Sequence, residues 1–194
     1  DPATGEPEIS LPIEAVKSVK VLPNPFAAEY GRFAGGVVTM LTKSGGNEFH
    51  GSFRDTLSND KWTAKTPLTV TPRQDKILNT YEATLGGFIL KDHIWFFAAG
   101  RDAKQSFSAQ SYIVDEPFTR SDTEKRYEGK LTLAATPNHR LVGSYMKIDR
   151  TQGGYGFGNA WGPSGFDFFD KASTYDRSLP QDLWAANYTG VLSD

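Results

Sequence analysis

Six segments with strand character, joined by connections of alternating length, constrain this chain more than any other feature of its sequence. The segments cover residues 48–57, 80–90, 94–103, 126–135, 140–149 and 183–192. Two connections, 91–93 and 136–139, are tight turns, whereas 58–79, 104–125 and 150–182 are long. Tight turns predict β-hairpins. We therefore expect an antiparallel sheet in which each strand pairs with its neighbours in the sequence.

Apolar and polar side chains alternate along the clearest of these segments. In the first segment one face holds Phe49, Gly51, Phe53 and Leu57, and the other holds His50, Ser52, Arg54 and Thr56. Because successive side chains of a strand point to opposite faces, such a segment has one apolar and one polar face. The third segment is apolar on both faces between residues 94 and 101, so its orientation stays open.

Composition excludes several classes of function. The 194 residues include no cysteine, which rules out a disulfide framework, a thiol nucleophile and a cysteine zinc site. His50, His93 and His139 are too far apart for a histidine metal centre. The formal net charge is -2, which leaves no electrostatic footprint for nucleic acid. We expect no cofactor, no metal and no nucleic-acid partner.

A membrane β-barrel explains the alternation in connection length, whereas a soluble sandwich does not. In outer-membrane barrels short turns face the periplasm, long loops face outside, and the strands alternate between lipid-facing and lumen-facing residues. Aromatic residues near the segment ends would lie in the two interfacial girdles of such a barrel. These residues are Phe49, Tyr81, Phe88, Trp95, Tyr127 and Tyr145.

Residues 9–46 form a different, compact unit. A predicted strand over 13–22 is followed by a Pro-Asn-Pro break, and residues 26–30 are long enough for one helical turn. A second strand is expected over 37–42, with Val37, Met40 and Leu41 in a small core. The change in pattern after Gly46 places a domain boundary between 1–46 and 47–194.

Residues 26–53 have the sequence FAAEYGRFAGGVVTMLTKSGGNEFHGSF. This stretch resembles the junction between plug and barrel in TonB-dependent outer-membrane receptors, most closely the Oar-like subgroup. The hairpin sequences LGGFILKDHIWFFAAGRD (85–102) and RYEGKLTLAATPNHRLVGSYMKID (126–149) are similar to barrel strands of the same subgroup. The resemblance implies a mostly-β fold in which residues 1–46 end a plug domain. Residues 47–194 would then form about six antiparallel strands of an incomplete transmembrane β-barrel.

The resemblance also implies a function and a location. Such receptors take up a substrate across the bacterial outer membrane and are energised by an inner-membrane complex. The implied partners are outer-membrane lipid, a TonB-type energy-coupling protein that binds a segment not present here, and a small-molecule, peptide or glycan substrate. A plugged barrel of about 22 strands would need roughly 550 residues, so we expect this sequence to be part of a longer receptor. The alternative is a non-transporting outer-membrane adhesin or carbohydrate-binding surface protein.

Two sets of residues are candidates for the site. Arg32, next to Glu29 in the plug motif, is a candidate latch that contacts the barrel carboxylates Glu82 and Glu128. The other interpretation of Glu29 and Arg32 is a surface ion pair on a short helix. The second set lies in the loop 150–182, whose aromatic residues could stack on a ligand or pack on one another. This ligand-contact loop contains Tyr155, Trp161, Phe166 and Phe168.

Other constellations do not indicate an enzyme or a bound ion. The glycines of 153–158 have dinucleotide-like spacing but are followed by Trp-Gly-Pro, which cannot begin the required helix. The acidic residues of 167–182 do not match the ligand spacing of an EF-hand. On a strand, His50 and Ser52 share a face that Asp55 does not, so they form no hydrolytic triad.

Overall fold

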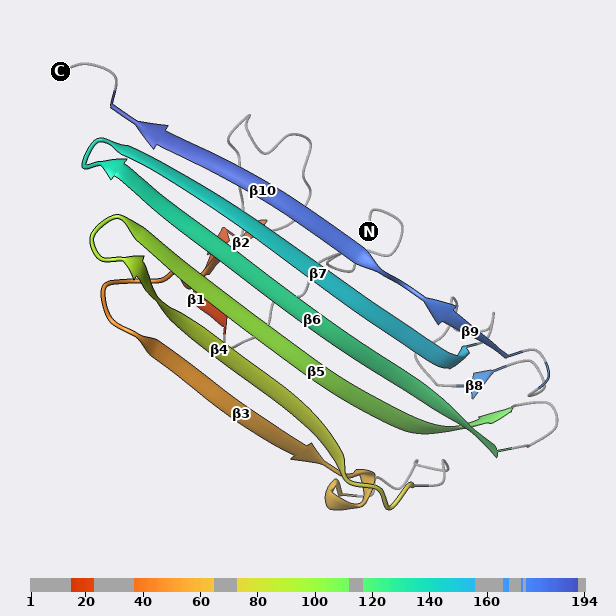
Figure 1. Cartoon of the computed structure of the whole chain (residues 1–194). Helices are drawn as coiled ribbons and strands as arrows, with labels where there is room; N and C mark the ends of the chain where they lie inside the picture. Colours follow the sequence, from red (N-terminus) through yellow and green to blue (C-terminus); the bar gives the residue numbers. More distant parts are fainter. Residues whose placement is uncertain are drawn as a thin grey trace.

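The computed structural model describes residues 15–22, 37–64, 73–111, 117–155, 166–167, 172 and 174–191. Most of them lie in one curved antiparallel sheet (Figure 1). Its long strands are β3 (His50–Ser58), β4 (Leu78–Leu90), β5 (Ile94–Ser111), β6 (Pro117–Thr136), β7 (His139–Tyr155) and β10 (Gln181–Gly190). They pair in the order β10-β7-β6-β5-β4-β3, so each long strand lies beside its sequence neighbours. The predicted fold class, an antiparallel portion of a β-barrel, is confirmed.

Shorter elements complete the described part of the chain. Strand β8 (Phe166–Asp167) pairs in parallel with β5, and β9 (Tyr175–Ser178) pairs antiparallel with β7. A 3-10 helix, η3 (Asp60–Trp62), follows β3, and Asn59 caps it by accepting a hydrogen bond from the backbone N–H of Lys61 at 2.8 Å. Among the residues that the structure describes, no helix is long and apolar enough to cross a membrane.

The expected long connection over 104–125 is wrong. Strands β5 and β6 remain paired as far as Gln110 and Pro117, so most of that stretch is a hairpin. The connection 150–182 likewise contains the end of β7 and the short strands β8 and β9. These strand extensions could not be recognised in the sequence, because a strand that meets water on both faces does not alternate between apolar and polar residues.

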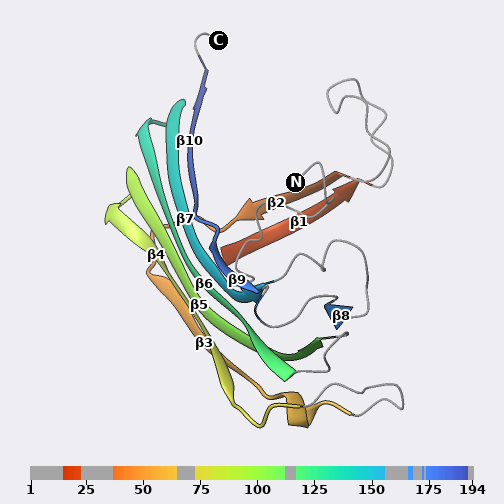
Figure 2. The ribbon, with the colours of Figure 1, turned by 90° about the vertical axis from the view of Figure 1, so that its right-hand side faces the viewer.

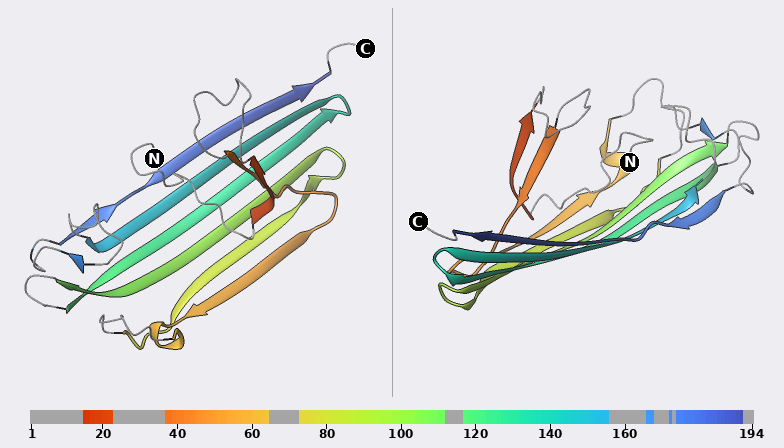
Figure 3. Two further views of the ribbon diagram at one scale, coloured as in Figure 1. Left: turned by 180° about the vertical axis from the view of Figure 1, so that it is seen from behind. Right: turned by 90° about the horizontal axis from the view of Figure 1, so that it is seen from above.

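The sheet is concave on the side that carries the N-terminal hairpin (Figures 2 and 3). That hairpin consists of β1 (Val16–Leu22) and β2 (Val37–Thr42), paired antiparallel. Ala15, which is fully buried just before β1, packs with Phe97 and Ala99 of β5. This packing shows that odd-numbered residues of β5 face the hairpin, which settles the orientation that the sequence left open.

The small core predicted for the N-terminal unit is not formed. Met40 is 43% exposed and Leu41 is also exposed, while the side chain of Val37 and the predicted helical turn 26–30 lie outside the described residues. Val19 pairs with Met40 and Val21 with Val38, so one face of the hairpin is an exposed apolar surface. A two-stranded hairpin cannot bury either of its faces by itself.

Candidate functional site

The outer, convex face of the sheet carries a continuous apolar band. One row across five strands follows from the pairing and contains Leu85, Ala98, Gly129, Tyr145 and Trp184. Leu85 is 51% exposed and Trp184 is 76% exposed, although neither has a charged neighbour in this row. A broad exposed apolar surface of this kind indicates contact with lipid or protein.

The apolar band ends at a row of aromatic side chains, which we call the aromatic row. It consists of Tyr81, Tyr127, Tyr145 and Trp184, which lie on a diagonal that shifts by two residues in register from β4 to β6 and again from β6 to β7. Tyr145 and Trp184 have ring centroids 4.1 Å apart, and the hydroxyl of Tyr145 donates to Asp182 at 2.7 Å. Tyrosine and tryptophan side chains combine an apolar ring with a polar group, and they therefore favour membrane interfaces.

The first outer-face residues beyond the aromatic row are charged or polar. The next outer-face residue is Asn79 after Tyr81, Lys125 after Tyr127 and Lys147 after Tyr145. Trp95 differs from the expected girdle residues, because its indole N–H donates to the side-chain oxygen of Asn47 at 2.7 Å. The sharp change from tyrosine to polar residues marks one boundary of a membrane-spanning region.

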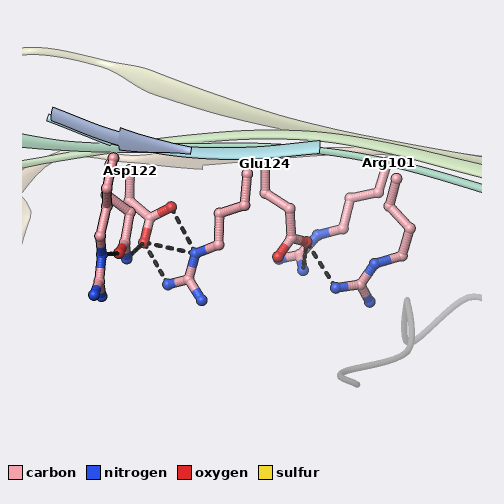
Figure 4. A network of polar contacts seen from close by, with 7 residues as sticks. Arg101, Asp122 and Glu124 are labelled. Carbon is pink, nitrogen blue, oxygen red and sulfur yellow. Dashed lines mark hydrogen bonds and ion pairs between the residues drawn. The ribbon is translucent and has the colours of Figure 1, made fainter. Parts of the chain in front are cut away.

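The concave face carries a ladder of charges (Figure 4). Arg101 lies 3.5 Å from Glu82 and 3.3 Å from Glu124, and Arg126 lies 3.0 Å from the same Glu124 oxygen. Arg126 is only 1% exposed. Removing one charged side chain from such a buried set of ion pairs leaves its partners without a compensating charge, which is strongly destabilising. This face is therefore a rigid polar wall.

A second polar cluster lies beyond the aromatic row, toward the long loops (Figure 4). Arg150 donates to both carboxylate oxygens of Asp122, and Gln152 donates to Asp122 at 2.8 Å. Gln152 in turn accepts from Arg177 at 2.7 Å. Burial alone would raise the pKa of Asp122, but the hydrogen bonds from Arg150 and Gln152 and the nearby positive charges lower it below its ordinary value.

Lys130 of β6 joins the N-terminal hairpin to the concave wall. Its ammonium group donates to the backbone carbonyls of Lys43 at 3.0 Å and Thr42 at 3.3 Å, and also to the hydroxyl of Thr42. Hydrogen bonds from a charged donor are stronger than neutral ones. The last residues of the hairpin are thus fixed to the middle of the sheet.

Residues 44–47 continue this attachment to the turn between β4 and β5. Asn47 accepts from the backbone N–H of Asp92 at 3.0 Å and donates to its carboxylate at 2.5 Å. Gly45 lies so close to the sheet that a Cβ atom there would meet the carbonyl oxygen of Phe96 and, at 2.5 Å, that of Gly87. The connection between hairpin and sheet therefore has a fixed path.

The structure describes half of the predicted latch. Glu82 and Glu128 are buried on the concave face, and Glu82 is paired with Arg101. Glu29 and Arg32 lie outside the described residues. The sequence analysis missed Lys130 and Asn47, and the only signal for Lys130 was its place on the polar face of its strand.

The predicted ligand-contact loop is described only in part. Tyr155 ends β7, and the guanidinium of Arg177 lies 3.7 Å from the centroid of its ring. Phe166 is described through its backbone alone, in β8, whereas Trp161 and Phe168 lie outside the described residues. The contact of Arg177 with Tyr155 is a cation–π interaction that the sequence did not reveal.

Comparison with known proteins gives a consistent result. Residues 41–121 match a family model described as an outer membrane beta barrel domain. The TonB-dependent transporter Oar of Myxococcus xanthus is 41% identical over 105 residues, which are 50% of this chain and 10% of that protein. The ferrienterobactin receptor of Escherichia coli is 48% identical over 44 residues, 22% of this chain and 6% of that receptor.

A third relative, a probable TonB-dependent siderophore receptor of Acinetobacter baumannii, is 54% identical over 43 residues, 22% of this chain and 6% of that receptor. No solved structure matches this chain. The chain spans about a tenth or less of the length of these curated relatives. Their names are those of transporters and receptors, which supports a role other than that of an enzyme.

The two-faced sheet and the family match define a β-barrel segment of the bacterial outer membrane. Within that class, the identity to Oar supports the resemblance drawn from the sequence: this chain is similar to part of an Oar-like TonB-dependent receptor.

Proposed function

We propose that this chain forms the passage from plug to barrel in a TonB-dependent transporter that takes up a substrate across the outer membrane. One observation carries the proposal: the ion-paired concave face holds the N-terminal hairpin, while the opposite face is an apolar band. A wall between lipid and an aqueous, plugged lumen needs these two surfaces back to back. Residues 1–46 are then the end of the plug and residues 47–194 the first barrel strands.

The orientation follows from the connections. The turns at 91–93 and 137–138 lie at one end of the sheet, and the extended hairpin of β5 and β6 projects at the other end, beyond the aromatic row. Short turns belong on the periplasmic side of such barrels. The aromatic row then marks the outer leaflet, and the projecting strands face the exterior.

The latch between plug and barrel is a finer part of the same proposal. Lys130 and Asn47 hold the end of the plug, and Arg32 with Glu29 would form a second contact at the wall. Glu82 is already paired with Arg101, whereas the buried Oε2 atom of Glu128 has no hydrogen-bond partner among the described residues. Glu128 is therefore the better acceptor for Arg32.

The substrate and the energy source are inferred from the class of TonB-dependent transporters. The substrate, a small molecule, peptide or glycan, would meet the long-loop end of the concave face, where Tyr155 lies under Arg177. Trp161, Phe166 and Phe168 of the same loop would add aromatic contacts. A TonB-type protein would supply energy through a segment outside this chain.

Bilayer conductance of the full-length receptor tests the proposal. The intact receptor should be nearly closed in a planar lipid bilayer, because the plug fills the lumen. Deleting residues 1–46 with everything that precedes them should produce large, stable conductance steps. A non-transporting adhesin would give no such steps after the deletion, and that result would reject the transporter.

A further inference from the structure

A polar groove lies on the outer face of the sheet, directly beyond the aromatic row. Its volume is about 510 Å³, and Tyr81 of the aromatic row forms part of its lining. The polar lining residues include Lys76, Asn79, Asp102, Lys104, Ser121 and Thr123. We call this site the outer groove.

The position of the outer groove sets what it can meet. On β6, outer-face residues change from Leu131, Gly129 and Tyr127 to Lys125, Thr123 and Ser121. On β5 the same change falls between Gly100 and Asp102, which pairs with Tyr81. Acyl chains cover the apolar band below this line, so the groove lies at the level of lipid headgroups.

The lining offers both donors and acceptors. Gln74 bridges the strands by donating to the hydroxyl of Thr119 at 3.1 Å and accepting from Ser106 at 2.9 Å. These bonds fix one wall of the groove. The Oδ1 atom of Asp102 is buried and has no hydrogen-bond partner within the part of the chain that is described. A buried acceptor without a donor is costly, and a hydroxyl-bearing ligand would satisfy it.

Three lysines give the groove a positive surrounding. Lys76 and Lys104 line it, and Lys125 lies next to Asp102 across the β5–β6 pair. All three are exposed, and no described carboxylate lies within ion-pair distance of them. By contrast, Lys61 is paired with Asp75 and Lys147 with Asp149. Two carboxylates face these ammonium groups, Asp102 and Asp55, which lies opposite Tyr81, whereas Asp149 opposite Lys125 is already paired with Lys147. Three ammonium groups against two carboxylates favour an anionic ligand that also carries hydroxyls.

We propose that the outer groove binds the phosphorylated sugar headgroup of an outer-leaflet glycolipid. Sugar hydroxyls donate to Asp102, and phosphate oxygens accept from Lys76, Lys104 and Lys125. Tyr81 lines the groove at the edge of the apolar band, so the acyl chains of the same molecule have an adjoining apolar surface to lie on. A free sugar phosphate would not use that surface. The proposal rests on the orientation given under the proposed function.

Lipid binding by the delipidated full-length receptor in detergent tests this site. The probes are lipid A, which has a phosphorylated glucosamine disaccharide, phosphatidylglycerol, which has phosphate without the sugar, and inorganic phosphate. Native mass spectrometry counts the lipids retained. We expect lipid A to bind at least about tenfold more tightly than phosphatidylglycerol, and inorganic phosphate not to displace it. The triple variant Lys76→Gln, Lys104→Gln, Lys125→Gln should lose about tenfold or more in affinity for lipid A.

A matched control separates the groove from general charge effects. The variant Lys17→Gln, Lys20→Gln, Lys91→Gln removes the same charge at positions away from the groove and should retain lipid A binding. Equal binding of phosphatidylglycerol, displacement by inorganic phosphate, or equal losses in both triple variants would overturn the proposal. The heat-dependent gel mobility of each variant reports barrel formation separately. A receptor that never forms a barrel would reject the proposed function, and a barrel without lipid A binding would reject only this site.

Discussion

The ammonium group of Lys130 lies 3.0 Å from the carbonyl oxygen of Lys43, although the two residues are 87 positions apart in the sequence. Lys130 stands on the concave wall, and Lys43 follows the last strand of the N-terminal hairpin. The contact places the exit of the hairpin against the middle of the sheet, before the chain enters β3. The hairpin is thus joined to the wall by side-chain contacts as well as by the covalent connection.

Replacing Lys130 by methionine should loosen this attachment. The substitution keeps an unbranched side chain but removes the donors to Thr42 and Lys43, at a cost of about 1.5–3 kcal/mol for a charged hydrogen-bonding group. In the full-length receptor we expect brief channel openings in planar bilayers and greater sensitivity of cells to large antibiotics. Lys91→Met, in the exposed turn, is the control. Equal leakage from the two variants would show that Lys130 does not hold the plug.

A pair of adjacent glycines allows a sharper test of the connection. A Cβ atom at Gly45 would lie 2.5 Å from the carbonyl oxygen of Gly87 and 2.8 Å from the backbone nitrogen of Phe96, whereas one at Gly46 would meet nothing within 4 Å. Gly45→Ala should therefore displace residues 43–47 and lower the yield of folded, heat-modifiable receptor. Gly46→Ala should fold like the wild type. If both variants fold equally well, the connection does not follow this path.

The sheet was predictable where one of its faces meets lipid. Phe53 and Leu131 alternate with polar residues, and that alternation is enough to locate β3 and β6 in the sequence. Above the membrane, Lys104, Gln105 and Ser106 lie on both faces of β5 without any such alternation. A strand of that composition cannot be distinguished from a loop, so the extended hairpin was missed.

The site was less predictable than the sheet, because its contacts join distant residues. Phe96 and Phe97 are both apolar, and only the packing of Ala15 on Phe97, which is 1% exposed, shows which of them faces the plug side. The polar-face position of Glu82 was evident in the sequence, but its partner Arg101 lies on the third segment, whose orientation was open. Pairing register, rather than composition, decides such contacts.

The cluster around Asp122 should make the long-loop hairpin sensitive to acid. The pKa of Asp122 in the folded protein is lower than in the unfolded chain, because hydrogen bonds from Arg150 and Gln152 outweigh the effect of burial. Its contribution to stability is therefore full above the unfolded pKa, about 3.9, and is lost as the pH falls through the lower folded value.

Amide hydrogen exchange of residues 118–125 measures this effect. Asp122→Asn should reduce the local opening free energy by about 1 kcal/mol at pH 7, since the pair with Arg150 is partly exposed. The difference between wild type and variant should shrink progressively below about pH 4. Asp60→Asn, which removes a carboxylate in η3 that has no ion pair among the described residues, should show neither change. A difference that persists at pH 2 would contradict the assignment to Asp122.

Two leucines on the same outer face should respond differently to the same charge. Leu85 lies in the apolar band below Tyr81, whereas Leu57 lies beyond the aromatic row, opposite Asn79. Both are about half exposed. If the band faces the hydrocarbon core, Leu85→Arg should destabilise the full-length barrel by about 2–4 kcal/mol, and Leu57→Arg by about 1 kcal/mol or less. Equilibrium unfolding in lipid vesicles measures both values. Equal costs at the two positions would mean that the aromatic row is no membrane boundary, and the orientation of the sheet in the outer membrane would have to be abandoned.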